Sequence, residues 1–228
     1  MRHLPPVALA ALAALSLAGC DRKKPAPAVP PPPVLAADAA VIGPLAAAVP
    51  FRALAETAYD AKPLPLDQAI AAAVAAAEHV KALLPPDAQV DLKTQLDALA
   101  AARRVDDRTN VALSAAEAYR VLVSHAPPGR VPAEVHLLDY AALRYDADRK
   151  APLVRWDDMA DATTFAQARW NAIAPRVTDP ALHNRMAKAL ADMAAAAARR
   201  DPALARDAVT RELEVVNLLD VLLNKPPA

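Results

Sequence analysis

Proline rather than glycine punctuates this chain, and this imbalance restricts its fold more than any other feature. The 228 residues include 23 prolines and three glycines, and only Gly43 and Gly129 follow residue 19. Tight β-hairpin turns usually need glycine, whereas proline is tolerated in the first turn of a helix but not in its interior. Alanine, the strongest helix former, dominates the rest. We therefore expect an all-α fold, an up-and-down antiparallel bundle of about six to seven helices.

Apolar periodicity places the helices between these prolines. The clearest stripe steps by three and four residues, through Trp156, Met159, Thr163, Ala166, Trp170 and Ile173. Expected helices cover residues 66–84, 133–149 and 156–174, and two more begin at the Asp-Pro-Ala-Leu sequences of 179–182 and 201–204. The polar run 103–110 divides residues 87–126 into two helices in the interpretation we favour, and one long helix is the alternative. The repeated tetrapeptide is interpreted as two helix starts with the same cap.

The N-terminus is typical of an exported protein. Arg2 and His3 form a basic start, and residues 7–17 are a mostly apolar run. This run is too short to cross a bilayer, which needs about 20 residues, but its length is that of a signal-peptide core. The run ends in Leu17-Ala18-Gly19-Cys20, and Cys20 is the only cysteine of the chain.

These four residues resemble the lipobox of bacterial lipoproteins at every position. The resemblance implies that residues 1–19 are a cleaved signal peptide and that Cys20 is acylated and held in a membrane. It also implies a bacterial cell-envelope location facing the periplasm, in which Asp21 favours the inner membrane and the outer membrane is the alternative. It covers the N-terminus alone, and the helical part resembles no family.

A tether separates the acylated cysteine from the folded part. Residues 25–33 contain six prolines and are expected to form an extended spacer of roughly 28 Å, at about 3.1 Å per residue. The expected organisation is a signal peptide at 1–19, an acylated tether at 20–34, an irregular or short-helix segment at 35–62 and the helical bundle domain at 63–228. Within residues 35–62, a short helix could have one face formed by Phe51, Leu54, Ala55 and Ala58.

The charge balance gives little indication of a partner. Removal of Arg2 with the signal peptide leaves 25 basic and 26 acidic residues. Such a nearly neutral chain has no strong field with which to attract nucleic acid, so we expect none as a partner. The expected partners are the membrane, through the N-terminal lipid, and a protein of the envelope.

Two sets of residues are candidates for a ligand site. Tyr140, Tyr145, Trp156, Phe165 and Trp170 could line an apolar pocket between helices, although we favour the interpretation that they form the thickest part of the core. His136 and Asp139 have metal-ligand spacing on one helical face, but no His-x-x-x-His or Glu-x-x-His motif supports them. We therefore expect no metal and no cofactor.

No motif for catalysis is present, since the chain lacks Gly-x-Ser-x-Gly, Ser-x-x-Lys and a glycine loop for phosphate. We expect a non-enzymatic interaction or scaffold module. The alternative is a periplasmic bundle that binds a small molecule or a metal.

The lipobox gives a direct prediction. Cys20→Ser should abolish lipid modification and processing without altering the helical fold, because the acylated thiol is absent and the bundle lies downstream. Metabolic labelling with a fatty acid and circular dichroism measure the two effects. Wild-type protein that remains unlabelled would contradict the prediction.

Overall fold

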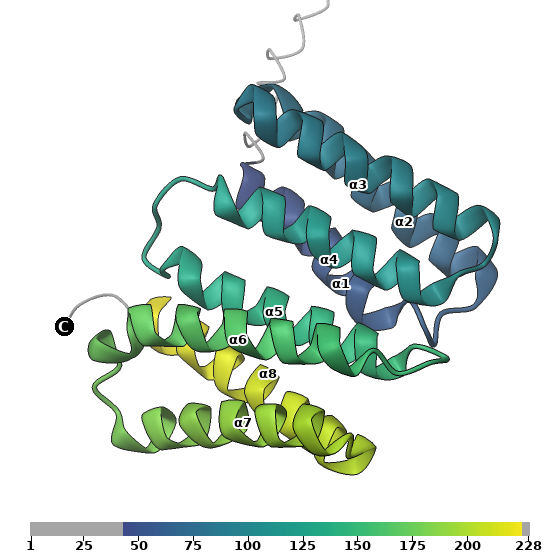
Figure 1. Ribbon diagram of the computed structural model, residues 1–228. Coiled ribbons are helices and arrows are strands. Elements are labelled where there is room, and N and C mark those ends of the chain that lie inside the picture. Colours follow the sequence, from purple (N-terminus) through teal and green to yellow (C-terminus); the bar gives the residue numbers. More distant parts are fainter. Residues whose placement is uncertain (1–42, 225–228) are drawn as a thin grey trace, which may run out of the picture. The chain divides into compact units, whose positions relative to one another are not determined.

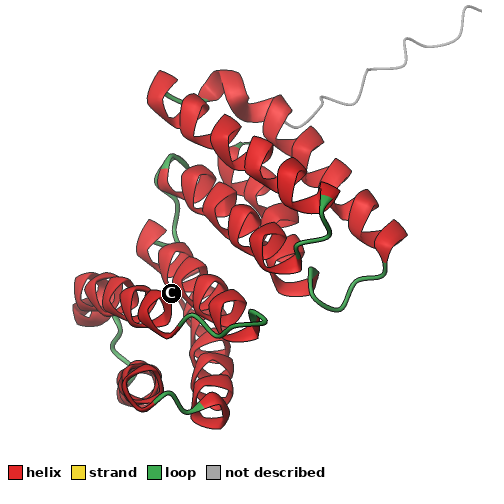
Figure 2. Ribbon diagram, turned by 45° about the vertical axis from the view of Figure 1, so that its right-hand side comes forward, coloured by secondary structure: helices red, strands yellow, loops and turns green. Residues whose placement is uncertain are grey.

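The computed structural model describes residues 43–224, and these residues form eight α-helices and no strand, as Figures 1 and 2 show. The all-α prediction is therefore confirmed. The helices are α1 (Pro44–Thr57), α2 (Pro63–Val80), α3 (Pro86–Arg104), α4 (Arg108–Ser124), α5 (Ala133–Lys150), α6 (Trp156–Ile173), α7 (Pro180–Arg199) and α8 (Pro202–Asn224). Single 3-10 turns follow α2 at Lys81–Leu83 and α6 at Ala174–Arg176. Among the described helices, none is long and apolar enough to cross a membrane.

Helix α1 makes the bundle larger than the sequence predicted. We expected residues 35–62 to be irregular or to hold a short helix, but α1 has 14 residues, and Phe51, Leu54 and Ala58 are completely buried. Pro50 lies inside α1, although proline is disfavoured in a helix interior. Because Pro50 has no amide proton, the carbonyl group of Ala46 one turn earlier lacks its helical donor. Ala46 is exposed, so water can satisfy this carbonyl group. The bundle thus begins at α1 rather than at residue 63.

The helices are packed as two groups of four. In the first half, α1 contacts α2 and α4, and α3 contacts α4. In the second half, α5 contacts α6 and α8, and α7 contacts α6 and α8, so that these four helices form a closed ring. The contact between α4 and α5 joins the halves, as the order of the ribbons in Figure 1 shows. This connectivity is the up-and-down arrangement that short loops favour.

Helix α5 is buried on two opposite faces. Leu137, Tyr140, Leu143 and Ala147 belong to the core of the first half, and Leu138 and Tyr145 belong to the core of the second. Successive residues of each set are three to seven positions apart, which keeps each set on one side of the helix. The two apolar cores therefore meet at α5.

Two residues with left-handed backbone take the place of glycine between helices. Asp106 (φ 52°) ends α3, and Arg200 (φ 53°) ends α7. In each turn the following amide donates to a carbonyl five residues back, from Asp107 to Ala102 and from Asp201 to Ala196, which is the pattern of a Schellman motif. The break at Asp106 confirms that residues 87–126 form two helices.

The two Asp-Pro-Ala-Leu sequences begin α7 and α8. The Asp179 carboxylate accepts the amides of Ala181 and Leu182, and the Asp201 carboxylate accepts those of Ala203 and Leu204. Proline is the first residue of both helices, where its missing amide proton costs nothing. Both aspartates are therefore N-caps.

Arg200 provides a test of the turn between α7 and α8. Its side chain is exposed and forms no ion pair among the described residues, so Arg200→Gly chiefly removes the strain of a left-handed residue. The variant should be about 0.5–1 kcal/mol more stable, since the relieved strain exceeds the added freedom of the unfolded chain. Urea unfolding followed by circular dichroism measures the difference, and a less stable variant would contradict this account of the turn.

Candidate functional site

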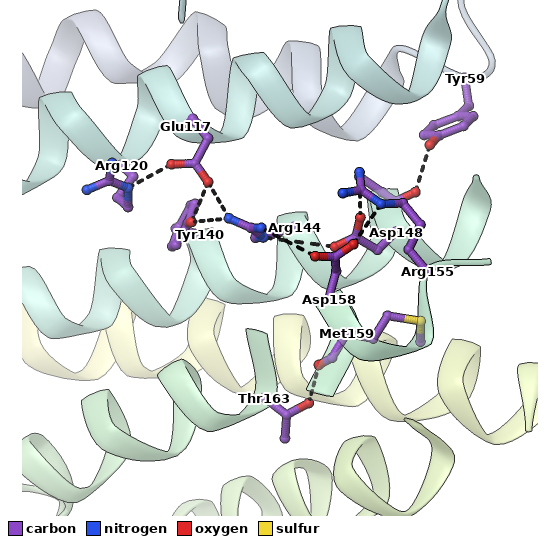
Figure 3. Close-up of polar contacts among 11 residues, drawn as sticks. Tyr59, Glu117, Arg120, Tyr140, Arg144, Asp148, Arg155, Asp158, Met159 and Thr163 are labelled. Carbon is purple, nitrogen blue, oxygen red and sulfur yellow. Dashed lines mark hydrogen bonds and ion pairs between the residues drawn. The ribbon is translucent and has the colours of Figure 1, made fainter. Parts of the chain in front are cut away.

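A polar network crosses the contact between the two halves of the bundle. The Glu117 carboxylate on α4 accepts hydrogen bonds from the Tyr140 hydroxyl at 2.6 Å, from Arg144 Nη1 at 2.7 Å and from Arg120 Nε at 2.8 Å, as drawn in Figure 3. Tyr140 and Arg144 are four residues apart on α5, so they point in the same direction. Glu117 thus connects α4 to one polar stripe of α5.

Asp148 continues this stripe one turn further along α5, and its side chain is completely buried. Its carboxylate lies 3.3 Å from Arg155 Nη1 and 3.9 Å from Arg144 Nε, and Asp158 also pairs with Arg155, at 2.7 Å (Figure 3). Burial raises the pKa of Asp148 to about 6, against the opposing effect of Arg155. A carboxyl group with this pKa would suit acid–base catalysis.

The centre of this network lies apart from the main cavities. Glu117, Arg144 and Asp148 line none of the five main cavities of the described bundle, although Arg155 and Asp158 line a depression beside it. The network links α4, α5 and the start of α6.

Glu212 is a second buried carboxyl group, in the middle of α8. It is completely buried, and neither of its oxygens has a hydrogen-bond partner among the described residues. Burial, and to a smaller extent the Asp139 charge, raise its pKa well above the usual value. Burial thus favours the protonated form of Glu212, because ionisation in an apolar core is costly.

A cleft lies at the beginning of α5, between α1, α5 and α8. It consists of an inner cavity of about 200 Å³ and an outer cavity of about 440 Å³, and both are lined by Leu45, His136 and Asp220. At the inner cavity, Arg52 donates to both oxygens of Asp139, at 2.6 and 2.9 Å. We call this the His136 cleft.

A groove of about 690 Å³ runs between α6 and α7. Its α6 wall extends from Trp156 to Asn171, and its α7 wall from Leu190 to Ala198. Small residues line much of it: Ala160, Ala168, Ala191, Ala194, Ala197 and Ala198. We call this the α6–α7 groove.

The structure does not bring the five predicted aromatic residues to one pocket. Tyr145 and Trp170 belong to the core of the second half, and Tyr145 donates to the Met193 carbonyl at 3.1 Å. Tyr140 and Phe165 pack edge to face with their ring centroids 5.4 Å apart. Only Trp156 lines one of the main cavities, in the α6–α7 groove and the depression beside it. The aromatic residues are therefore distributed over both cores and the edge of the groove.

The predicted metal candidates do share a cavity, since His136 and Asp139 both line the inner part of the His136 cleft. However, Arg52 engages both oxygens of Asp139, and no group of three or more potential ligands occurs among residues 43–224. Fewer than three protein ligands do not make a zinc site. Cys20 and Asp21 lie outside the described residues.

Local sequence does not distinguish several polar residues of these sites. Arg52 lies within an apolar segment, and Asp220 and Glu212 lie within an apolar helix. One signal was available for the network: Tyr140, Arg144 and Asp148 recur every four residues on a helix with apolar residues on its other faces. Such a stripe indicates buried polar contacts rather than a solvated face.

Comparison with known proteins gives no identification. No family model matches the chain, no curated protein is similar to it, and no solved structure has a detectably similar fold. Function therefore has to be inferred from the cavities and from the N-terminal sequence.

The pKa of Asp148 predicts a pH dependence of stability. The folded protein keeps this proton up to about pH 6, whereas an unperturbed aspartate loses it near pH 3.8. Ionisation thus costs the folded state more than the unfolded state, and the free energy of unfolding should fall as the pH rises between these values. The free energy of unfolding of Asp148→Asn, measured relative to that of the wild type, should therefore increase by about 1–2 kcal/mol between about pH 4 and about pH 7. Urea unfolding at both pH values measures this gain, and an unchanged difference would contradict it.

Proposed function

We propose that this protein is a lipid-anchored protein of the bacterial cell envelope whose helical bundle is a non-enzymatic interaction module. The lipobox at Cys20 supports the anchor, and the proline-rich residues 25–33 support a spacer between membrane and bundle. In this proposal the module faces the periplasm and binds a protein partner. The inner membrane, which Asp21 favours, is the proposed site of attachment, and the outer membrane is the alternative.

The observation that carries the proposal is the α6–α7 groove. Its α6 wall runs over four turns, from Trp156 to Asn171, which is about 22 Å at 1.5 Å per residue. Alanines on both walls allow another backbone to approach closely, and Thr164, Gln167 and Asn171 offer hydrogen bonds along the same wall. A groove of this length between two helices suits an amphipathic helix of a partner protein.

The buried acidic residues fit a structural role better than catalysis. Asp148 and Glu117 lie in the contact between helices, away from the main cavities. The groove itself contains only Asp157 and Arg200 as ionisable groups. This set lacks the adjacent nucleophile and base that covalent catalysis needs.

A small-molecule site is the second candidate, and the His136 cleft is the observation that favours it. Its outer cavity of about 440 Å³ falls within the usual volume range of ligand pockets. The two candidates are compatible, because the cleft and the groove share no lining residue.

Site-specific crosslinking in living cells tests the interaction module. A photo-crosslinking amino acid at position Thr164, which is exposed in the groove, should give an adduct of defined mass. The crosslinked peptide should belong to an amphipathic helix. Ala194→Trp should remove the adduct, because the indole fills the groove from the opposite wall.

Ala100 provides the matched control. It is exposed on α3 and lines none of the main cavities, so a crosslinker there should not give the adduct, and Ala100→Trp should leave the Thr164 adduct unchanged. An adduct that survives Ala194→Trp, or that forms equally from Ala100, would contradict binding in the groove.

A further inference from the structure

The His136 cleft contains charged and polar groups that the interaction module does not use. The inner cavity lies between α1, α4, α5 and α8, and its apolar lining comes from Leu45, Val49, Val135 and Val216. Asp220 and His136 stand where the inner and outer cavities meet. A ligand in the cleft would therefore have an apolar body and a polar end near these two residues.

The positive charge of the inner cavity is already compensated. Arg52 donates to both oxygens of Asp139, and its Nη1 lies 2.9 Å from the Glu56 carboxylate. One guanidinium thus faces two carboxylates, and its donors are directed at them. An anion would have to compete with both, so the inner cavity is unsuited to a negatively charged ligand.

Asp220 adds a negative charge that has no compensation among the described residues. Its carboxylate forms no ion pair and accepts no hydrogen bond from any of them, although the side chain is only partly exposed. The outer cavity carries both signs, with Arg130 and Arg176 beside Glu134. The excess negative charge is therefore concentrated at the inner cavity, at Asp220.

His136 offers a second group without a partner. Its Nε2 atom is buried and has no hydrogen bond within the described bundle. Burial lowers the pKa of His136, which favours the neutral ring, and in the tautomer with its proton on Nδ1 the Nε2 atom is an acceptor. Because His136 Nε2 is closed to solvent, the Asp220 carboxylate is the acceptor that a ligand in the cleft can reach, and it favours a ligand that donates hydrogen bonds and carries positive charge.

We propose that the His136 cleft binds a small alkylammonium ion. The ammonium group donates to the Asp220 carboxylate, and the alkyl chain packs against Leu45, Val49 and Val216. A free alkylamine and a lysine side chain share this chemistry. A divalent metal ion does not fit, since it needs more ligands than the described residues group together.

Calorimetric titration of the full, detergent-solubilised chain tests this site with three probes of equal length. Butylammonium should bind, butanol should bind about tenfold more weakly or worse, and butyrate should not bind. Nα-acetyl-lysine amide distinguishes the source of the amine. Tighter binding than butylammonium indicates a lysine side chain as the natural ligand, and weaker binding indicates a free amine. Butyrate that binds as well as butylammonium would overturn the proposal.

One variant and a control locate the ion. Asp220→Asn should weaken butylammonium binding by about tenfold or more because it removes the counter-charge. Asp207→Asn is the matched control, since Asp207 is an exposed aspartate on the same helix outside the cleft. Thermal unfolding verifies that each variant is folded. Equal affinities of Asp220→Asn and wild type would overturn the site. The Thr164 crosslink is independent of this outcome, because Thr164 lies in the groove.

Discussion

Helix α5 packs against helices of both halves of the bundle, so its residues have to satisfy two cores at once. Leu137 and Leu143 contribute to one core, and Leu138 and Tyr145 to the other. A helix that is apolar all round could rotate between alternative packings with little loss of buried area. The polar stripe that begins at Tyr140 prevents this, because rotation would take its hydrogen bonds to Glu117 away. The arrangement of the two halves therefore depends on one helix, on its hydrogen bonds to α4 and on its ion pairs with Arg155 and Asp158 at the start of α6.

This arrangement fixes orientation at a cost in stability. Asp148 is buried with arginines at 3.3 and 3.9 Å, and neither of its oxygens accepts a hydrogen bond with good geometry. The pKa of Asp148 is raised because the nearby arginines offset only part of the cost of burying its charge. Glu212 has no hydrogen-bond partner in the described bundle, and burial raises its pKa well above the usual value. Buried polar groups of this kind restrict a core to one packing, which an alanine-rich interior with small side chains does not achieve by shape alone.

The fold was predictable from the sequence to the extent that it depends on local periodicity. The buried stripe of α6 and the N-caps Asp179 and Asp201 follow from residue spacing. The spacing of residues on α8 favours a buried face of Val209, Leu213, Val216, Leu219 and Leu223, but the structure buries Glu212 completely and Leu213 only in part. Because α8 packs on both α5 and α7, its buried sector is wider than one stripe and includes a carboxyl group that hydrophobicity assigns to solvent. The pair Arg52–Asp139 joins residues 87 positions apart, which local spacing cannot reveal.

The position of α5 also explains where the cavities are. Along most of its length both faces are filled by neighbouring helices, so a cavity can form only beyond its ends or on helices that face away from it. The His136 cleft lies at its first turn, an open depression beside Lys150 follows its last turn, and the α6–α7 groove lies between two other helices. The contacts that hold the bundle together are thus separate from the surfaces available for binding. Substitutions at Glu117 or Asp148 should change stability, whereas those at Asp220 or Ala194 should change binding.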